Sequence, residues 1–200
     1  MRALLVGATG LLGSEVLAEL QSRGCEVFAP PSDELDITDD RVVSAFFLGT
    51  SVDWIVNCAA YTAVDQAEDE PDRVRLLNAY GPMLLARVTT YLPVRLLHMS
   101  TDFVFDGKKR APYHEDDETN PLCVYARTKL EGETHVLDEN PENIVVRTAW
   151  LFGNNGGCFP ATILRLAEQA DKELRVVTDQ HGSPTYAPDL AAAIANLIEA

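Results

Sequence analysis

The sequence predicts an α/β fold built on a parallel sheet that helices cover on both faces. Short, nearly uninterrupted apolar segments alternate with longer amphipathic segments along the chain. Parallel strands that are buried on both faces have this apolar character, and the amphipathic segments suit the helices that connect them. A glycine-rich turn after the first apolar segment is the third observation, because such a turn opens the first helix of doubly wound, Rossmann-type sheets.

The N-terminal part of the chain supplies three of the predicted strands. Residues 3–6 form a short apolar run before the glycine-rich turn, and the helix after the turn ends at Gly24. Pro30 and Pro31 end the second strand. The predicted elements are, in order, a strand at 3–6, a helix from the turn to residue 23, a strand at 26–29, a helix at 39–48 and a strand at 54–57.

The C-terminal part continues the alternation and divides the chain into two predicted parts. The predicted elements are a helix at 72–91, a strand at 94–99, a polar loop at 102–119, a helix at 122–137, a strand at 144–147, a helix at 159–169, a strand at 174–177 and a helix at 188–199. We expect residues 1–150 to form a dinucleotide-binding domain that carries the catalytic residues. Residues 151–200 are expected to continue the sheet and to begin a partial C-terminal substrate lobe. Because the chain ends inside a predicted helix, two expectations stay open: the protein is a short, degenerate member of its fold, or the chain is truncated.

Composition and charge exclude several classes of protein. The formal net charge is −15, which argues against a general binder of nucleic acid or of anionic membranes. The four cysteines are scattered without the spacing of a metal site, so we expect no metal. The sequence contains neither a signal peptide pattern nor an apolar run of membrane-spanning length. These features predict a cytoplasmic protein.

The glycine-rich turn predicts a dinucleotide site. Gly7, Gly10 and Gly13 allow a tight turn and the close approach of a pyrophosphate, and the following helix presents N–H donors and a partial positive charge. A simple strand–helix turn needs only one glycine. The end of the second strand, residues 28–32, carries neither an acidic residue nor an arginine, so the choice between NAD and NADP stays open.

Tyr125 and Lys129 are the candidate catalytic pair. They lie four residues apart on a predicted helix, which places both side chains on one face. A nearby ammonium would lower the pKa of the phenol from about 10 towards neutrality. The spacing alone is common, but Ser100, Thr101 and Asp102 follow a predicted strand, where a hydroxyl can bond a reacting carbonyl oxygen. Asp102 also suits a simple turn or helix cap. With the glycine turn, these residues predict hydride transfer.

Seven segments resemble the extended short-chain dehydrogenase/reductases, and within them the dTDP-4-dehydrorhamnose reductase family. They are GATGLLGSE (7–15), LDITD (35–39), VNCAAYTAVDQAE (56–68), STDFVFDG (100–107), YARTKLEGE (125–133), RTAWLFG (147–153) and VTDQHGSPT (177–185). The resemblance covers essentially the whole chain.

The resemblance implies reduction of the 4-keto group of dTDP-4-dehydro-L-rhamnose by NADPH or NADH in dTDP-L-rhamnose biosynthesis. The implied catalytic residues are Thr101, Tyr125 and Lys129, with Tyr125 as the proton donor. The implied cofactor-binding residues are Gly7, Gly10, Leu11, Leu12, Gly13, Asp36, Ile37, Ala59, Ala60, Tyr61, Tyr125 and Lys129. The implied substrate-binding residues are Thr101, Asp102, Phe103 and Trp150, where Phe103 replaces the tyrosine usual in the family. The expected partners are a nucleotide sugar and, in a homodimer, a second copy of the chain.

Two other functions remain open for this fold. One is a sugar-nucleotide epimerase or dehydratase that keeps its cofactor tightly bound. The other is a dinucleotide-binding regulatory subunit of the methionine adenosyltransferase type. The STDFVFDG segment favours the reductase over the first alternative, and the complete set of Thr101, Tyr125 and Lys129 disfavours the second.

Overall fold

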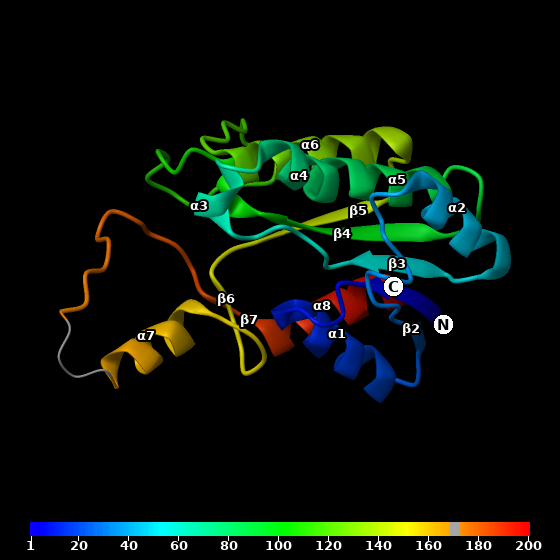
Figure 1. Cartoon of the computed structure of the whole chain (residues 1–200), viewed down its shortest axis with the longest axis horizontal. Helices are drawn as coiled ribbons and strands as arrows, with labels where there is room; N and C mark the ends of the chain where they lie inside the picture. The colour runs from blue at the N-terminus through cyan, green and yellow to red at the C-terminus, as the bar shows by residue number, and fades with distance from the viewer. Residues whose placement is uncertain (169–172) are drawn as a thin grey trace.

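A computed structural model describes residues 1–168 and 173–200, and its centre is a five-stranded parallel sheet (Figure 1). The strands are β1 (Arg2–Val6), β2 (Glu26–Phe28), β3 (Trp54–Asn57), β4 (Arg95–Thr101) and β5 (Ile144–Thr148), in the order β2-β1-β3-β4-β5. Every neighbouring pair is parallel. After β1, the chain forms β2 at one edge of the sheet. It then crosses to the other side of β1 to form β3, so the direction of the strand order reverses between β1 and β3. Ligands of doubly wound sheets bind at such a switch point. The predicted fold class is confirmed.

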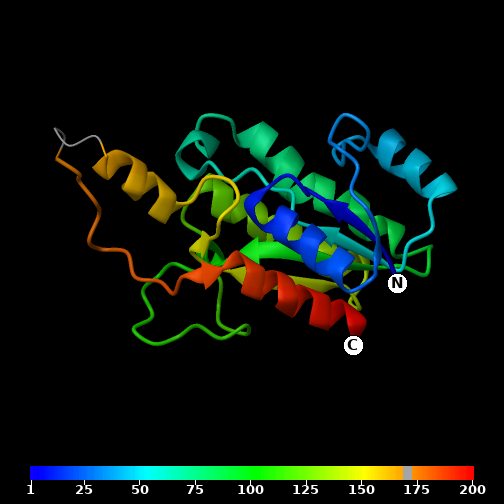
Figure 2. The ribbon, with the colours of Figure 1, turned by 90° about the horizontal axis from the view of Figure 1, so that it is seen from below.

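Helices cover both faces of this sheet (Figures 1 and 2). On one face lie α1 (Leu11–Ser22) and α8 (Ala187–Glu199), and on the other lie α2 (Asp40–Gly49), α5 (Gly81–Val88) and α6 (Val124–Glu139). Successive strand residues point to opposite faces. Accordingly, Leu4 and Ile55 enter the core beneath α2, α5 and α6, whereas Leu5 and Val56 enter the core beneath α1 and α8.

The segment expected to be one helix over 72–91 is built from three consecutive pieces. They are α4 (Pro71–Arg75), the π-helical turn η1 (Leu76–Tyr80) and α5, and the short helix α3 (Val64–Ala67) precedes them. The wider turn of η1 includes the fully buried Asn78. A β-carbon at Gly132 of α6 would lie 2.2 Å from the Asn78 carbonyl oxygen, so glycine allows α6 to approach η1 closely. This contact fixes the position of the helix that carries Tyr125.

The C-terminal part differs from the prediction in two ways. The expected strand at 174–177 is wrong, because these residues are exposed and pair with no other strand. Nor do residues 151–200 continue the main sheet, since β6 (Leu151–Phe152) and β7 (Thr185–Tyr186) form a separate two-stranded parallel sheet. The apolar character of residues 174–177 predicts a strand, but these residues have no neighbouring strand with which to pair in the described part of the chain.

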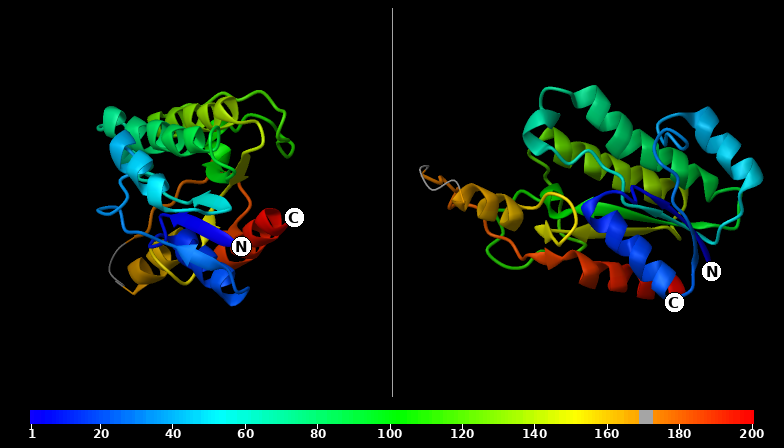
Figure 3. Two further views of the ribbon diagram at one scale, coloured as in Figure 1. Left: turned by 90° about the vertical axis from the view of Figure 1, so that its right-hand side faces the viewer. Right: turned by 60° about the horizontal axis from the view of Figure 1, so that its bottom comes forward.

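Two helices frame this C-terminal part. The helix α7 (Phe159–Ala167) lies beyond the carboxyl ends of the strands (Figures 2 and 3), and residue 169 of its predicted range lies outside the described residues. The final helix α8 confirms the prediction over 188–199 and packs beside α1. Ala191, Ile194 and Ala195 of α8 are fully buried in the same core as α1. Residues 187–199 therefore complete the sheet's helical layer. Among the described helices, none has both the length and the apolar character needed to cross a membrane.

Candidate active site

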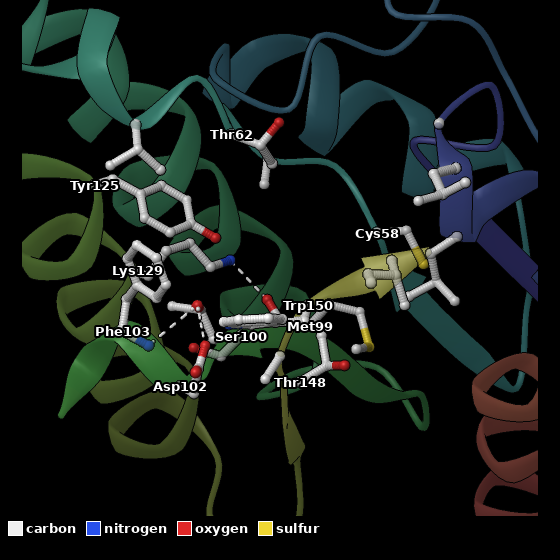
Figure 4. A pocket seen from close by; sticks show the side chains of 18 of the residues that line it. Cys58, Thr62, Met99, Ser100, Asp102, Phe103, Tyr125, Lys129, Thr148 and Trp150 are labelled. Atoms are coloured by element: carbon white, nitrogen blue, oxygen red, sulfur yellow. Dashed lines mark hydrogen bonds between the residues drawn. The ribbon is translucent and has the colours of Figure 1, made fainter. Parts of the chain in front are cut away.

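A pocket of about 410 Å³ opens at the carboxyl edge of the main sheet (Figure 4). Its walls come from the start of α1, the segment after β3, the end of β4, the first turns of α6 and the segment after β5. The predicted site residues that line it are Gly10, Leu11, Leu12, Gly13, Ala60, Thr101, Asp102, Phe103, Tyr125, Lys129 and Trp150. One cavity thus joins the glycine turn to the predicted catalytic pair.

The glycine turn forms a cradle at one end of this pocket. Gly7 has a φ of +80°, and a β-carbon there would lie 2.6 Å from the Ala59 nitrogen. A β-carbon on Gly13 would lie 2.0 Å from the Gly7 oxygen. Gly10 is less crowded, since its β-carbon would meet only the Gly7 oxygen, at 3.4 Å. Gly7 and Gly13 therefore allow backbone packing, whereas Gly10 borders the cavity.

The N-terminus of α1 supplies donors for an anion beside this cradle. The first N–H groups of a helix have no acceptor within the helix. In α1 these belong to Leu11, Leu12 and Gly13, all of which line the pocket. Their N–H groups and the helix dipole suit the phosphates of a dinucleotide. The cradle and its donors fit the predicted cofactor.

Tyr125 lies in the first turn of α6 and faces the pocket (Figure 4). The helix starts where the Glu68 carboxylate accepts a hydrogen bond from the Val124 N–H at 2.7 Å. The Phe103 ring packs edge-to-face on the phenol, with ring centroids 5.9 Å apart. Burial is the largest influence on the pKa of Tyr125 and raises it, while the Thr101 hydroxyl opposes the shift. The expectation of a lowered pKa is wrong here, and the phenol keeps its proton at neutral pH.

Lys129 is buried one helical turn below Tyr125, with 2% of its surface exposed. Its Nζ donates to the Met99 carbonyl oxygen at 2.6 Å and lies 3.1 Å from His98 Nε2. Burial lowers the pKa of Lys129 to about 8, and the nearby Glu133 and Cys58 oppose this change. The amine is therefore held by the end of β4 (Figure 4) and titrates close to neutral pH.

An ion pair behind the pocket links α6 to two strands. Arg147 of β5 contacts Glu133 of α6 through Nη2–Oε2 at 2.6 Å and Nε–Oε1 at 3.0 Å. The Ser100 hydroxyl donates to the same carboxylate. Arg147 also donates to the Glu115 carbonyl oxygen at 3.2 Å. Because Glu133 lies one turn beyond Lys129, this network sets the position of α6.

Besides Gly7, four predicted cofactor residues do not line the pocket. Asp36 accepts hydrogen bonds from the Thr38 N–H and hydroxyl at 2.9 and 2.7 Å, and Ile37 is a buried core residue. Ala59 packs against Gly7. The Tyr61 backbone forms two hydrogen bonds with the Asn78 side chain. Their contacts with a cofactor stay predictions.

The predicted substrate residues Asp102, Phe103 and Trp150 line the pocket together with Thr101. Burial is the largest influence on the pKa of Asp102 and raises it. Trp150 has a φ of 48° and is 44% exposed. A β-carbon on Gly182 would lie 2.4 Å from the Trp150 Nε1, so the indole rests directly on the Gly182 backbone. Backbone strain of this kind occurs where a side chain is held for binding.

Sequence reasoning missed several residues of the pocket. Among them are Cys58, Thr62 and Thr148. Thr148 ends β5 beside Thr101, and its buried hydroxyl has no hydrogen-bond partner among the described residues. The rule that selected Thr101, a hydroxyl at the carboxyl end of a strand, would also have selected Thr148. Burial raises the pKa of the Cys58 thiol to about 12, so this cysteine is not an activated nucleophile.

Comparison with known proteins identifies close relatives of the whole chain. Residues 1–200 match the family described as RmlD substrate binding domain. A dTDP-4-dehydrorhamnose reductase from Mycolicibacterium smegmatis is 44% identical over 200 residues, which are 99% of this chain and 60% of that protein. The chain thus spans less than two thirds of this curated relative.

Solved structures give the same result in three dimensions. The crystal structure of a dTDP-4-dehydrorhamnose reductase from Clostridium acetobutylicum has a TM-score of 0.95 and 41% identity, covering 100% of this chain and 70% of that one. The dTDP-4-dehydrorhamnose reductase from Bacillus anthracis, in complex with NADP, has a TM-score of 0.93 and 36% identity, covering 100% and 71%.

Proposed function

Because the chain belongs to the RmlD substrate-binding domain family, we propose that it contributes to an NADPH- or NADH-dependent reductase of nucleotide sugars. The proposed reaction is reduction of the 4-keto group of dTDP-4-dehydro-L-rhamnose, in the formation of dTDP-L-rhamnose. The observation that carries this proposal is a single pocket that joins the N-terminus of α1 to Tyr125 and Lys129. The 44% identical reductase supports the choice of substrate.

The dinucleotide is proposed to bind along the glycine turn, as the NADP-bound relative supports. Its pyrophosphate would lie at the N–H groups of Leu11, Leu12 and Gly13, with Ala60 and Lys129 further along the pocket. When bound there, the reduced nicotinamide supplies the hydride for the keto carbon. Asp36 and Ile37 remain predicted contacts on the adenosine side. Separate binding titrations with NADPH and NADH decide between the two cofactors.

Tyr125 is the proposed proton donor to the keto oxygen. Its raised pKa keeps the proton on the phenol until negative charge develops on the sugar oxygen. The Thr101 hydroxyl accepts from the Phe103 N–H at 3.2 Å and donates to Asp102 Oδ1 at 3.4 Å, so it would turn its proton from that carboxylate to the same sugar oxygen. Asp102, Phe103 and Trp150 border the space proposed for the sugar. Their packing would exclude water from the reacting carbonyl.

The proposal also covers the cellular location and the oligomeric state of the protein. We propose a cytoplasmic enzyme, in agreement with its four free cysteines. A homodimer is proposed as its assembled state, which sedimentation or light scattering of the purified protein would test.

The decisive experiment follows NADPH and NADH oxidation with dTDP-4-dehydro-L-rhamnose. The matched control sugar is dTDP-glucose, which has no keto group at C4. We expect oxidation that requires the keto sugar. A dinucleotide that binds without any oxidation would contradict the proposal and favour the regulatory-subunit alternative. NAD that stays bound through purification would instead favour an epimerase or dehydratase.

A further inference from the structure

Behind the pocket, a buried row of side chains connects the end of β3 to Lys129. Asn57 of β3 and His98 of β4 are fully buried and lie opposite each other in the parallel ladder. Asn57 Nδ2 is 3.1 Å from His98 Nδ1, and His98 Nε2 is 3.1 Å from Lys129 Nζ. The proposed reaction uses neither Asn57 nor His98. Their contact with Lys129 raises the question of what they contribute.

A backbone group fixes the direction of this row of hydrogen bonds. The Ala59 N–H lies 3.0 Å from Asn57 Oδ1 and can only donate. The oxygen of the Asn57 amide therefore faces Ala59, and its NH₂ group faces His98. Because an amide NH₂ carries only donors, His98 Nδ1 must accept from it.

The proton of the His98 ring then lies on the opposite nitrogen. A neutral imidazole whose Nδ1 accepts carries its proton on Nε2, which faces Lys129. A charged imidazolium would direct a second proton at the Asn57 NH₂. The pKa of His98 is well below its usual value, with burial as the largest cause and Lys129 as the second, in agreement with a neutral ring.

Lys129 has to accept the Nε2–H hydrogen bond if the row is to be complete. An ammonium has three donors and no lone pair, so it cannot accept. A neutral amine accepts from His98 and still donates to the Met99 carbonyl oxygen, 2.6 Å away. With an ammonium, at least one buried hydrogen bond of the row is lost.

We propose that Asn57 and His98 are positioning residues that shift Lys129 towards its neutral amine. A neutral amine beside Tyr125 places no positive charge there to stabilise the phenolate, so the phenol keeps its proton until the sugar oxygen accepts it. This catalytic consequence rests on the proposed function, whereas the direction of the hydrogen bonds does not.

Other charged or titratable groups near Lys129 act on the same equilibrium. Glu133 of α6 and Cys58 after β3 favour the ammonium. Arg147 of β5 is paired with Glu133 and weakens that influence. Tyr125 lies on the pocket side of α6. Asn57, His98 and burial favour the neutral amine, whereas Glu133 and Cys58 favour the ammonium. Removing the contribution of Asn57 or His98 should therefore raise the pKa of Lys129.

The first test measures the tautomer of His98 by ¹⁵N NMR, at a pH of about 9.5, above the titration of Lys129. The sequence contains only four histidines, and the variant His98→Phe assigns the signal. We expect the proton on Nε2 in the wild-type protein. A proton on Nδ1 would overturn the proposal, and this measurement requires neither dinucleotide nor sugar.

The second test uses Asn57→Asp to reverse the direction of the hydrogen bonds from residue 57 to Lys129. A carboxylate accepts from both the Ala59 N–H and His98 Nδ1–H, so Nε2 becomes an acceptor for an ammonium. We expect the His98 proton to move to Nδ1 and the pKa of Lys129 to rise by about one unit or more. The variant Asn57→Leu removes the hydrogen bond without adding charge, and it should also raise this pKa.

The lysine titration is readily resolved, since the chain has only four lysines. The variant Lys129→Arg assigns the buried signal. An unchanged Lys129 titration in both Asn57 variants would refute the proposal. If either variant fails to fold, the wild-type tautomer still decides. A failed reductase assay with the predicted tautomer present would refute only the proposed function.

Discussion

Replacing Gly13 with alanine places a methyl group inside the backbone of the glycine turn. The new β-carbon would lie 2.0 Å from the Gly7 oxygen, 2.7 Å from the Gly7 carbonyl carbon and 2.9 Å from the Ala8 Cα. All three neighbours are backbone atoms, so no flexible side chain can move aside. The start of α1 has to separate from the turn by more than about 1 Å.

The expected cost of this overpacking is about 3 kcal/mol, the upper part of the usual range, because only backbone can yield. For a chain of this length, that cost lowers the melting temperature by about 6–12 °C. Differential scanning calorimetry of Gly13→Ala measures it directly. The displaced α1 N-terminus should also lose its affinity for NADPH and NADH.

Two other glycines provide matched controls. A β-carbon at Gly49, in α2, meets nothing within 4 Å, so Gly49→Ala should melt at or slightly above the wild-type temperature. Gly10→Ala should keep its stability but bind dinucleotide more weakly, because Gly10 borders the pocket. If Gly13→Ala melts within about 1 °C of the wild type, the packing argument is refuted.

Three further predictions concern the groups around the pocket. Glu133→Gln breaks the ion pair with Arg147 and should lower the free energy of unfolding, measured in urea, by about 2–3 kcal/mol. The control Glu131→Gln breaks a more exposed ion pair with Arg75 and should cost under about 1 kcal/mol. Equal losses in the two variants would contradict this prediction. The folded-state pKa of Lys129 lies below its unfolded value, so the unfolded chain binds the extra proton between about pH 8 and 10.5. Stability should therefore rise with pH across that window, by up to roughly 3 kcal/mol relative to Lys129→Met, and a flat difference would exclude the shift. Thr148→Val removes a hydroxyl without a partner and should leave the melting temperature unchanged or higher while weakening ligand binding; a clear loss of stability would show that the hydroxyl is satisfied.

The sequence was sufficient to predict most of the fold. Its strands are short apolar runs that end at glycine, proline or polar residues, and local patterns of this kind do not depend on distant contacts. The segment 174–177 has the same apolar character, but a strand needs a neighbouring strand edge, and periodicity contains no information about one. The π-turn η1 was missed for a related reason, since its wider turn accompanies tertiary packing of Asn78 and Gly132.

The candidate site was predictable where chemistry follows a local rule. Tyr125 and Lys129 share a helix face, and Thr101 ends a strand, so spacing and position brought them together. Asn57 and His98 could not be found this way. They act through the register of two parallel strands, which places them side by side although 41 residues separate them in the chain. The rise in the pKa of Tyr125 was also hidden, because burial depends on the complete pocket.

The rate of Tyr125→Phe tests the central claim most directly. With dTDP-4-dehydro-L-rhamnose and the preferred dinucleotide, loss of the phenolic proton donor should lower kcat by about 10²–10⁴-fold. Dinucleotide affinity should stay close to that of the wild type, because the ring and its packing against Phe103 are kept. A variant that reduces the sugar at the wild-type rate would contradict the assignment of Tyr125 as the proton donor.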